Sequence, residues 1–198
     1  MENKSELYIR NRINIIEQTI DAAAEMGLTS VSMRTIAKKA EMDTSTIYHY
    51  FKNKEDLLYE SILHINKCFD DAMMEIVISE SADDEATFKT YLRFMYNYLK
   101  NKPNHASVMR QGSIISHLLF TAEQRSELFK QTTEHFKMCS FLNSIKERYT
   151  VIEEFSYVVT FFCYMPIYDL AMATYSPSKI SEKQLEMYID ALWKSLQD

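Results

Sequence analysis

Glycine and proline are nearly missing from this chain, whose 198 residues include Gly 2 and Pro 3. Average proteins contain roughly 7% glycine and 5% proline. Tight turns between strands depend on these two residues, so a sheet protein of this length would lack the turns that it needs. The sequence therefore predicts an all-α fold, with about nine helices joined by few sharp loops.

Apolar residues recur at steps of three and four along most of the chain, which is the spacing of one helix face. The first such stripe runs from Ile9 to Ala23, and Gly27 is expected to end that helix in a left-handed conformation. The polar segment from Ser79 to Asp84 predicts a loop. The expected helices cover residues 9–23, 33–40, 44–50, 55–78, 85–101, 104–118, 122–148, 152–174 and 180–196.

The apolar segments do not predict a membrane protein. The first residues are polar, unlike a signal peptide, and this favours a cytoplasmic location. The stretch from Phe155 to Ala173 has a single charge, Asp169, but it contains Pro166 and lacks basic flanks. It is therefore expected to be a buried helix that makes no contact with a membrane.

No pattern of reactive residues predicts catalysis. The sequence has no glycine-rich phosphate loop, no His-Glu-x-x-His pair and no nucleophile elbow. Its three cysteines have no metal-ligand spacing and are expected to be buried thiols. We therefore expect no enzyme activity, no catalytic residue, no metal and no cofactor.

Positive charge gathers near the N-terminus of an acidic chain. The formal net charge is −6, yet the segment from Arg10 to Lys54 contains seven Lys and Arg residues and only five acidic ones. Nucleic-acid binding needs a basic face rather than a basic protein. The N-terminal quarter is therefore the candidate for such a face.

Residues 32–56 follow the plan of a helix-turn-helix, with two short helices, a three-residue connection and a long third helix. Ser32 and Asp43 are predicted to cap the short helices, Asp43 by accepting from the Thr46 backbone N–H. In the second short helix Ile47 and Phe51 are expected to face inward. The remaining side chains of 44–50 are polar or aromatic, as a major-groove surface requires.

The same residues resemble the DNA-binding domain of the TetR (tetracycline-repressor) family of bacterial regulators. The matching runs are Met33 to Ala37, Ala40, and Thr46 to Leu57, and the similarity covers residues 9–60. The resemblance implies a DNA-binding domain at 1–54 and a helical effector-binding and dimerisation domain at 55–198. It also implies that double-stranded operator DNA is bound by Arg10, Ser32, Arg34, Thr44, Ser45, Thr46, Tyr48, His49, Tyr50 and Lys54.

Two residues depart from the family pattern. Glu41 stands where a glycine commonly makes the turn, and a non-glycine residue with positive φ costs roughly 1 kcal/mol. Asp43 replaces a more usual Ser or Thr, and its charge would repel nearby phosphates. Both positions put the docking geometry on DNA in question without changing the expected fold.

The C-terminal helices are expected to hold a small hydrophobic or aromatic effector. The chain is rich in methionine and aromatic residues, which suit adaptable pockets. Plain core packing is the alternative for each of these residues. The predicted pocket walls are Tyr91, Phe94, Tyr98, Met109 and Phe129.

A homodimer is expected because one short recognition helix makes too few contacts, so two half-sites are read by a two-fold pair. The apolar helix at 152–174 and the last helix could form a four-helix interface, and packing of both helices inside one chain is the alternative. The predicted interface residues are Phe161, Phe162, Leu185, Ile189, Leu192 and Trp193.

The sequence thus predicts a DNA-binding transcriptional regulator, specifically a repressor that binds a palindromic operator as a dimer and is released by a small molecule. The alternative is a DNA-binding adaptor controlled by a protein partner without a small-molecule ligand. A sealed cavity of several hundred Å³ in residues 85–148 would favour the sensor, and a filled core the adaptor.

Overall fold

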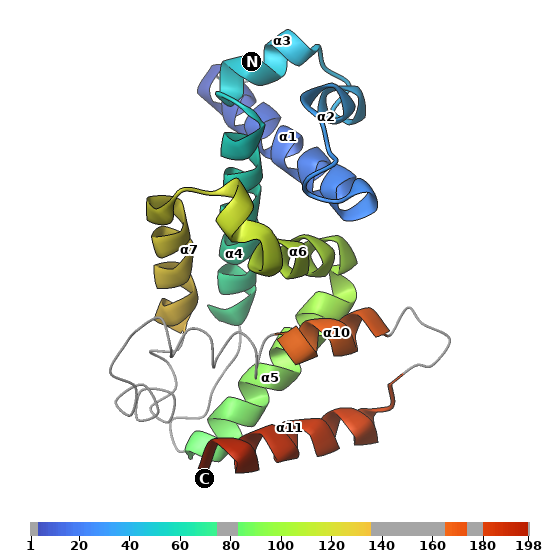
Figure 1. Ribbon diagram of the computed structural model, residues 1–198, viewed down its shortest axis with the longest axis vertical. Coiled ribbons are helices and arrows are strands. Elements are labelled where there is room, and N and C mark those ends of the chain that lie inside the picture. The colour runs from blue at the N-terminus through green and yellow to red at the C-terminus, as the bar shows by residue number, and fades with distance from the viewer. Residues whose placement is uncertain (1–3, 75–82, 136–164, 174–179, 198) are drawn as a thin grey trace.

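The computed structural model describes residues 4–74, 83–135, 165–173 and 180–197, and within these residues it contains nine helices and no strand (Figure 1). The all-α prediction is confirmed. Among the described residues no helix is both long and apolar enough to cross a membrane. The helices are α1 (Lys4–Met26), α2 (Met33–Lys39), α3 (Thr44–Tyr50), α4 (Lys54–Met74), α5 (Asp84–Asn101), α6 (Pro103–Leu119), α7 (Ala122–His135), α10 (Met165–Ala173) and α11 (Glu182–Gln197).

The predicted helix ends at Gly27 and Ser32 agree with the structure, and Asn53 adds a further cap. Gly27 has φ +93° directly after α1, which is the left-handed conformation that ends many helices. Ser32 caps α2 by accepting from the Thr35 backbone N–H at 3.2 Å. Asn53 does the same before α4, accepting from Asp56 N–H at 2.7 Å. These local signals fix where the chain turns.

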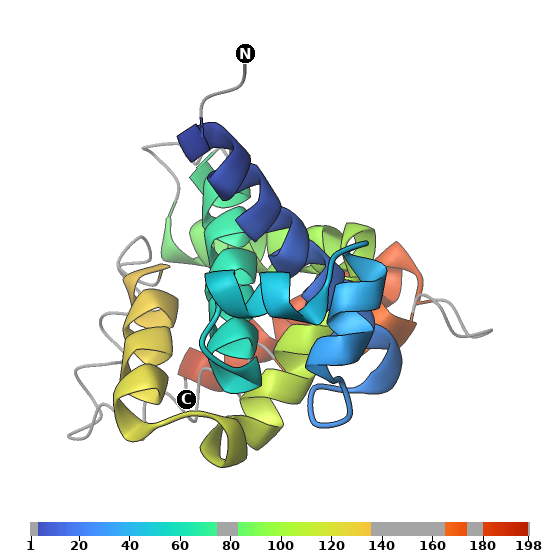
Figure 2. The same cartoon turned by 90° about the horizontal axis from the view of Figure 1, so that it is seen from above.

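The first turns of helix α1 extend beyond the core that buries the rest of the helix. Ile16 and Ile20 are buried, but Ile9 and Ile13 of the same stripe are 54% and 43% exposed. Figure 2 shows the first turns of α1 projecting beyond the helices packed on its other end. The expected amphipathic stripe is therefore buried only from Ile16 onward, because the contacts of α3 with the first turns, at Tyr8 and Asn11, leave Ile9 and Ile13 uncovered.

A first core, here called the head core, joins α1, α2, α3 and the N-terminal part of α4. Its buried members are mainly isoleucine, leucine, valine and alanine, and α6 contributes Val108. Its buried residues are Ile15, Ile16, Ile20, Ala22, Ala23, Leu28, Val31, Met33, Ile36, Ala37, Ala40, Ile47, Phe51, Leu57, Leu58, Ile62, Ile65, Val108 and Phe120.

A second core, here called the body core, lies around α5 and is rich in aromatic rings. Helices α10 and α11 both pack on α5, so neighbouring helices cover more than one side of α5. The buried members are Met73, Phe88, Tyr91, Leu92, Met95, Tyr96, Leu99, Ala106, Ile167, Tyr168, Ala171, Leu185, Ile189, Leu192 and Trp193.

The two cores lie at opposite ends of the molecule. In Figure 1 helices α1 to α3 occupy the top, α5, α10 and α11 the bottom, and α4 and α6 lie between them. The expected helices at 122–148 and 152–174 are seen as α7 and α10, and their remaining residues 136–148, 152–164 and 174 lie outside the described ranges. The predicted domain boundary after residue 54 stays a prediction, since the head core includes residues of α4 and α6.

Candidate nucleic-acid interface

Helix α3 is anchored by its inner face and leaves its outer face open. Ile47 is fully buried and Phe51, directly after the helix, is 2% exposed, as the sequence predicts. On the outer side Ser45 and His49 are exposed and Tyr48 is 52% exposed. This face therefore carries hydroxyl and imidazole groups, which can hydrogen-bond to base edges and phosphates.

The turn between α2 and α3 has the left-handed geometry that a glycine normally provides. Glu41 has φ +56°, the single non-glycine residue with positive φ among the described residues. The Met42 backbone N–H donates to the Ala37 carbonyl at 3.0 Å and closes the turn. The turn is thus kept with a glutamate, at a conformational cost of roughly 1–2 kcal/mol.

Asp43 precedes α3 as expected, but its side chain does not cap the helix. Its carboxylate makes no cap hydrogen bond, and the Thr46 N–H instead donates to the Asp43 backbone carbonyl at 2.9 Å. The prediction of a side-chain cap is therefore wrong. The backbone bond of the first turn meets the need of that N–H, so the exposed carboxylate stays at the start of α3.

Tyr50 is the member of α3 that the structure turns toward α1. Its ring stacks on Tyr8 with centroids 4.8 Å apart, and its hydroxyl accepts from Asn11 Nδ2 at 3.2 Å. The sequence reasoning missed Tyr8 and Asn11. Their spacing of three residues on one helix was the available signal, but it does not say which distant residue they meet.

The basic side chains near α3 differ in their exposure and in the contacts that they make. Arg10 and Arg34 are exposed. Arg12 pairs with Glu60 at 2.9 Å and lies over the Phe51 ring. Lys54 donates through Nζ to the Thr29 carbonyl at 3.1 Å. Arg12 therefore braces α1 against α4 rather than reaching outward.

The comparisons with known proteins agree with this geometry. The family model described as bacterial regulatory proteins, tetR family, matches residues 15–60, which include α2, the turn and α3. Residues 15–60 thus carry the sequence pattern of the tetR family. A relative that this chain matches in part is the HTH-type transcriptional regulator BetI of Klebsiella pneumoniae (strain 342), 36% identical over 66 residues. That match spans 33% of each protein.

Solved structures extend the similarity of fold over nearly the whole chain. A TetR family transcription regulator from Marinobacter aquaeolei VT8 has a TM-score of 0.75 and 18% identity, with 93% of this chain and 94% of that one covered. The transcriptional regulator FadR from Bacillus subtilis, in complex with stearoyl-CoA, has a TM-score of 0.59 and 17% identity. It covers 93% of this chain and 96% of its own. The body thus has the fold of these regulators.

The body of this chain brings four of the five predicted pocket residues together. Phe69 of α4 lies 5.2 Å from Phe94, 5.2 Å from Tyr98 and 6.3 Å from Tyr91, measured between ring centroids. Met109 packs against the same core. The side chain of Phe129 lies outside the described residues. Among the described side chains the rings contact one another directly, and Phe69 is the member that the pocket prediction omitted.

A polar group adjoins these rings. The Tyr98 hydroxyl and His105 Nδ1 are 3.1 Å apart, and burial raises the pKa of Tyr98 well above its usual value. Burial also lowers the pKa of His105, so its imidazole is neutral near pH 7. Nearby, His64 Nε2 lies 2.7 Å from Glu17, and burial raises the pKa of the Cys68 thiol beside it. The described residues hold no cluster suited to a metal ion.

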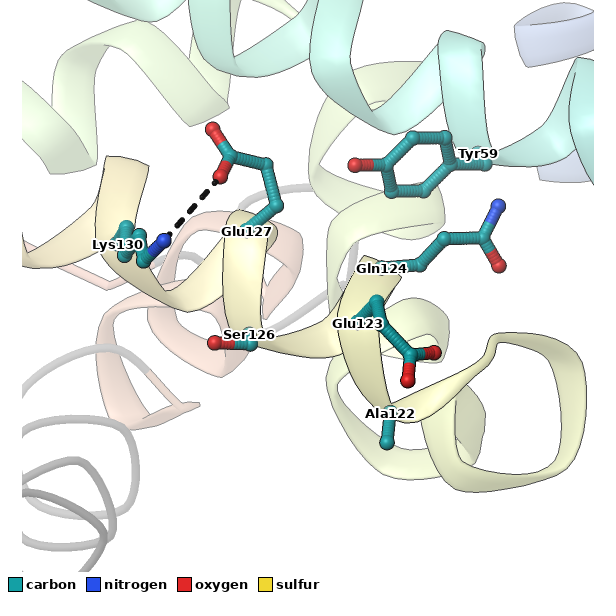
Figure 3. Close-up of a pocket in the computed structure, with 7 residues that line it drawn as sticks. All are labelled: Tyr59, Ala122, Glu123, Gln124, Ser126, Glu127 and Lys130. Atoms are coloured by element: carbon teal, nitrogen blue, oxygen red, sulfur yellow. Dashed lines mark ion pairs between the residues drawn. The ribbon is translucent and has the colours of Figure 1, made fainter.

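A hollow of about 680 Å³ lies between Tyr59 of α4 and α7 (Figure 3). It is open to solvent, and apart from Tyr59 its described lining comes from α7 alone. Glu127 in this lining pairs with Lys130 at 3.8 Å. The hollow differs from the sealed cavity that would mark a sensor, and the predicted pocket residues do not line it. Its described lining residues are Tyr59, Ala122, Glu123, Gln124, Ser126, Glu127 and Lys130.

The predicted interface residues of α11 are already covered within one chain. Leu185, Ile189, Leu192 and Trp193 are at most 6% exposed, and Trp193 lies 5.6 Å from Phe88 of α5 between ring centroids. Packing inside the chain, the alternative reading, therefore accounts for these four side chains, and the structure does not offer them to a partner. The remaining predicted interface residues, Phe161 and Phe162, lie outside the described ranges.

Proposed function

We propose that this chain is a transcriptional repressor that binds a palindromic operator as a dimer and is released by a small hydrophobic or aromatic molecule. The observation that carries the proposal is α3, whose inner face is fixed by Ile47 and Phe51 while its outer face is free. A recognition helix needs a buried face that anchors it to the domain and an exposed polar face that contacts DNA.

The DNA contacts divide by exposure. Ser45, Tyr48 and His49 are the most open on α3, and we assign them to the major groove. The half-buried Thr44 and Thr46 lie at its first turn. We assign the remaining predicted residues to phosphates or to positioning the helix, with Tyr50 placed lowest because α1 already binds its hydroxyl. These remaining residues are Arg10, Ser32, Arg34, Tyr50 and Lys54.

Two observations support an apolar effector. Aromatic rings of α4 and α5 meet at the centre of the body, with Phe94 and Tyr98 only half-buried. The FadR structure from Bacillus subtilis contains stearoyl-CoA in the same fold. An effector that enters among these rings would displace α5 and tilt α4, and the distance between the two recognition helices would change. A coupling free energy of about 1.4 kcal/mol suffices for a tenfold loss of DNA affinity.

The alternative function, an adaptor controlled by a protein partner, also has one observation in its favour. Phe69 is in ring contact with Tyr91, Phe94 and Tyr98, so these rings of the body occupy the space between α4 and α5. A thermal-shift screen of the full chain with acyl-CoA esters and aromatic acids separates the two. A concentration-dependent rise in Tm supports the sensor, and its absence across the screen supports the adaptor.

DNA binding by a dimer is tested with duplexes enriched from a random-sequence library by the full-length chain. With about six phosphate contacts, affinity should fall roughly 10³-fold between 50 and 200 mM salt. Sedimentation should show at least two chains on each duplex. Tyr48→Ala should weaken binding, and Met187→Ala serves as the control because Met187 is exposed on α11 at the far end of the molecule. One chain per duplex, or affinity that ignores salt, would contradict the proposal.

A further inference from the structure

Three consecutive residues of α6 contact three different helices. Arg110 Nε pairs with Asp169 Oδ1 of α10 at 2.5 Å. Gln111 bonds to the end of α1. Gly112 is buried against α4, where an added Cβ would meet Ile62 Cδ1 at 3.0 Å. Helix α6, which lies between the two ends of the molecule in Figure 1, is therefore held to the body and to the DNA-binding helices by neighbouring side chains.

The Gln111 amide uses both of its ends. Its Oε1 accepts from the Leu28 backbone N–H at 2.9 Å, and its Nε2 donates to the Ala23 carbonyl at 3.4 Å and to Ser107 Oγ at 3.2 Å. Ala23 and Leu28 flank the end of α1, where helix backbone groups lack partners within the helix. Leu28 is 1% exposed, so water is a poor substitute for Gln111 there.

The bonded segment controls the direction in which the chain enters α2. Gly27 reverses the chain with φ +93°, and Leu28 and Val31 then enter the head core. An ion pair or hydrogen bond elsewhere on α1 would hold that helix, but the bond to Leu28 holds the corner between α1 and α2. The position of α2 and α3 relative to α6 therefore depends on this corner.

We propose that Gln111 is the positioning residue through which α6 sets the orientation of the DNA-binding helices. The inference rests on the proposed function and deepens it, because it names the side chain that joins the body to α1. Arg110 gives α6 its link to α10, whose Ile167 and Ala171 are fully buried in the body core. A shift of α10 therefore reaches the end of α1 through two adjacent residues.

The test uses full-length variants and duplexes enriched by the wild-type chain. Gln111→Met keeps the length of the side chain and removes the bonds to Leu28, Ala23 and Ser107, and Gln111→Ala is a second removal variant should the first not fold. Gln111→Glu keeps an acceptor for Leu28. Asn104→Ala is the matched control, since it removes another bond between α6 and α1, the exposed one from Asn104 Nδ2 to Asp21 at 2.7 Å.

Two measurements are made far below the Tm, namely hydrogen exchange at the Leu28 amide and DNA affinity per folded molecule. Gln111→Met should raise the exchange rate roughly tenfold or more and weaken DNA binding about fivefold or more. Gln111→Glu should recover most of the protection of the Leu28 amide and most of the DNA affinity. Asn104→Ala should stay within about twofold of the wild type in affinity.

Each contrary result has a distinct meaning. Faster exchange at Leu28 with unchanged DNA affinity overturns the inference, because Gln111 would then only stabilise the fold. An equal loss of affinity in Asn104→Ala, or no recovery in Gln111→Glu, overturns it as well. A wild-type chain that enriches no duplex overturns the proposed function and the inference together, whereas a binding wild type with an equally binding Gln111→Met overturns the inference alone.

Discussion

The two cores of this chain differ in what fills them. In the head core the buried aromatic residues are Phe51 and Phe120, and the rest is aliphatic apart from Met33. The body core buries Phe88 and Trp193, together with Tyr91, Tyr96 and Tyr168. β-Branched side chains such as isoleucine have one strongly preferred rotamer in a helix, so an aliphatic core holds one arrangement.

Aromatic rings with a polar end behave differently. Tyrosine combines a large apolar surface with a hydroxyl that needs a partner, and Tyr98 finds it in the buried His105. The body therefore contains a titratable group in its interior, close to the rings proposed to meet an effector. The DNA-binding helices are therefore expected to keep one geometry, whereas the stability of the body is expected to depend on pH.

The largest expected effect comes from the head core. Phe51→Ala should lower the free energy of unfolding by about 3–5 kcal/mol, because it opens a cavity under α3 and removes the ring beneath Arg12. Urea denaturation followed by circular dichroism measures it. Tyr48→Ala, at an exposed position of the same helix, should change stability by no more than about 0.5 kcal/mol. Equal losses in both variants would refute the assignment of inner and outer faces.

The second effect concerns acid sensitivity of the body. Burial lowers the folded-state pKa of His105 below its ordinary 6.5, so the unfolded chain binds more protons as the pH falls. This contribution to stability is complete above about pH 6.5 and is lost as the pH falls toward the folded-state pKa. We expect the urea midpoint to drop between pH 7.5 and 5.5 by more in the wild type than in His105→Asn. The same drop in both proteins would show that His105 is not responsible.

A smaller effect is expected at the turn before α3. Glu41→Gly should raise the free energy of unfolding by about 1 kcal/mol, since glycine adopts φ +56° without the strain of a side chain. Thermal unfolding by calorimetry measures the gain. Glu41→Ala removes the charge but keeps the strain, and it should leave stability near the wild-type value. A gain of the same size with alanine would assign the cost to charge instead of backbone conformation.

The smallest effect is expected at Asp43. Its carboxylate does not cap α3, and a negative charge beside phosphates opposes DNA binding, so Asp43→Ser should strengthen binding a few-fold at low salt. The gain should be similar for enriched and unrelated duplexes, because it acts through phosphates. Unchanged affinity at low salt would mean that the carboxylate points away from the DNA backbone.

The parts of this structure that sequence reasoning predicted depend on nearby residues. Ser32 and Gly27 mark helix ends through bonds within a few positions, and Ile47 and Phe51 face inward because of helix periodicity alone. The left-handed turn at Glu41 followed from the family pattern. Such signals lie within a single turn or helix and can be read without knowing the tertiary fold.

Apart from the local Asp43 cap, the features that sequence reasoning left open or missed depend on distant contacts. The exposure of Ile9 depends on where the other helices stop, and the burial of Leu185 depends on how α11 meets α5. The same holds for the bonds from Gln111 to Ala23 and Leu28, which lie more than eighty positions away in the sequence. An apolar helix face in the sequence predicts burial, but it does not indicate whether the same chain or a second copy buries it.

The place of Trp193 has a practical consequence. It is the chain's single tryptophan, and it lies in the body core against Phe88. Its fluorescence emission therefore reports on the body alone, without any added label. Loosening of the DNA-binding helices would leave this emission unchanged while the far-ultraviolet signal fell, so the two ends of one unmodified molecule can be followed separately in one cuvette.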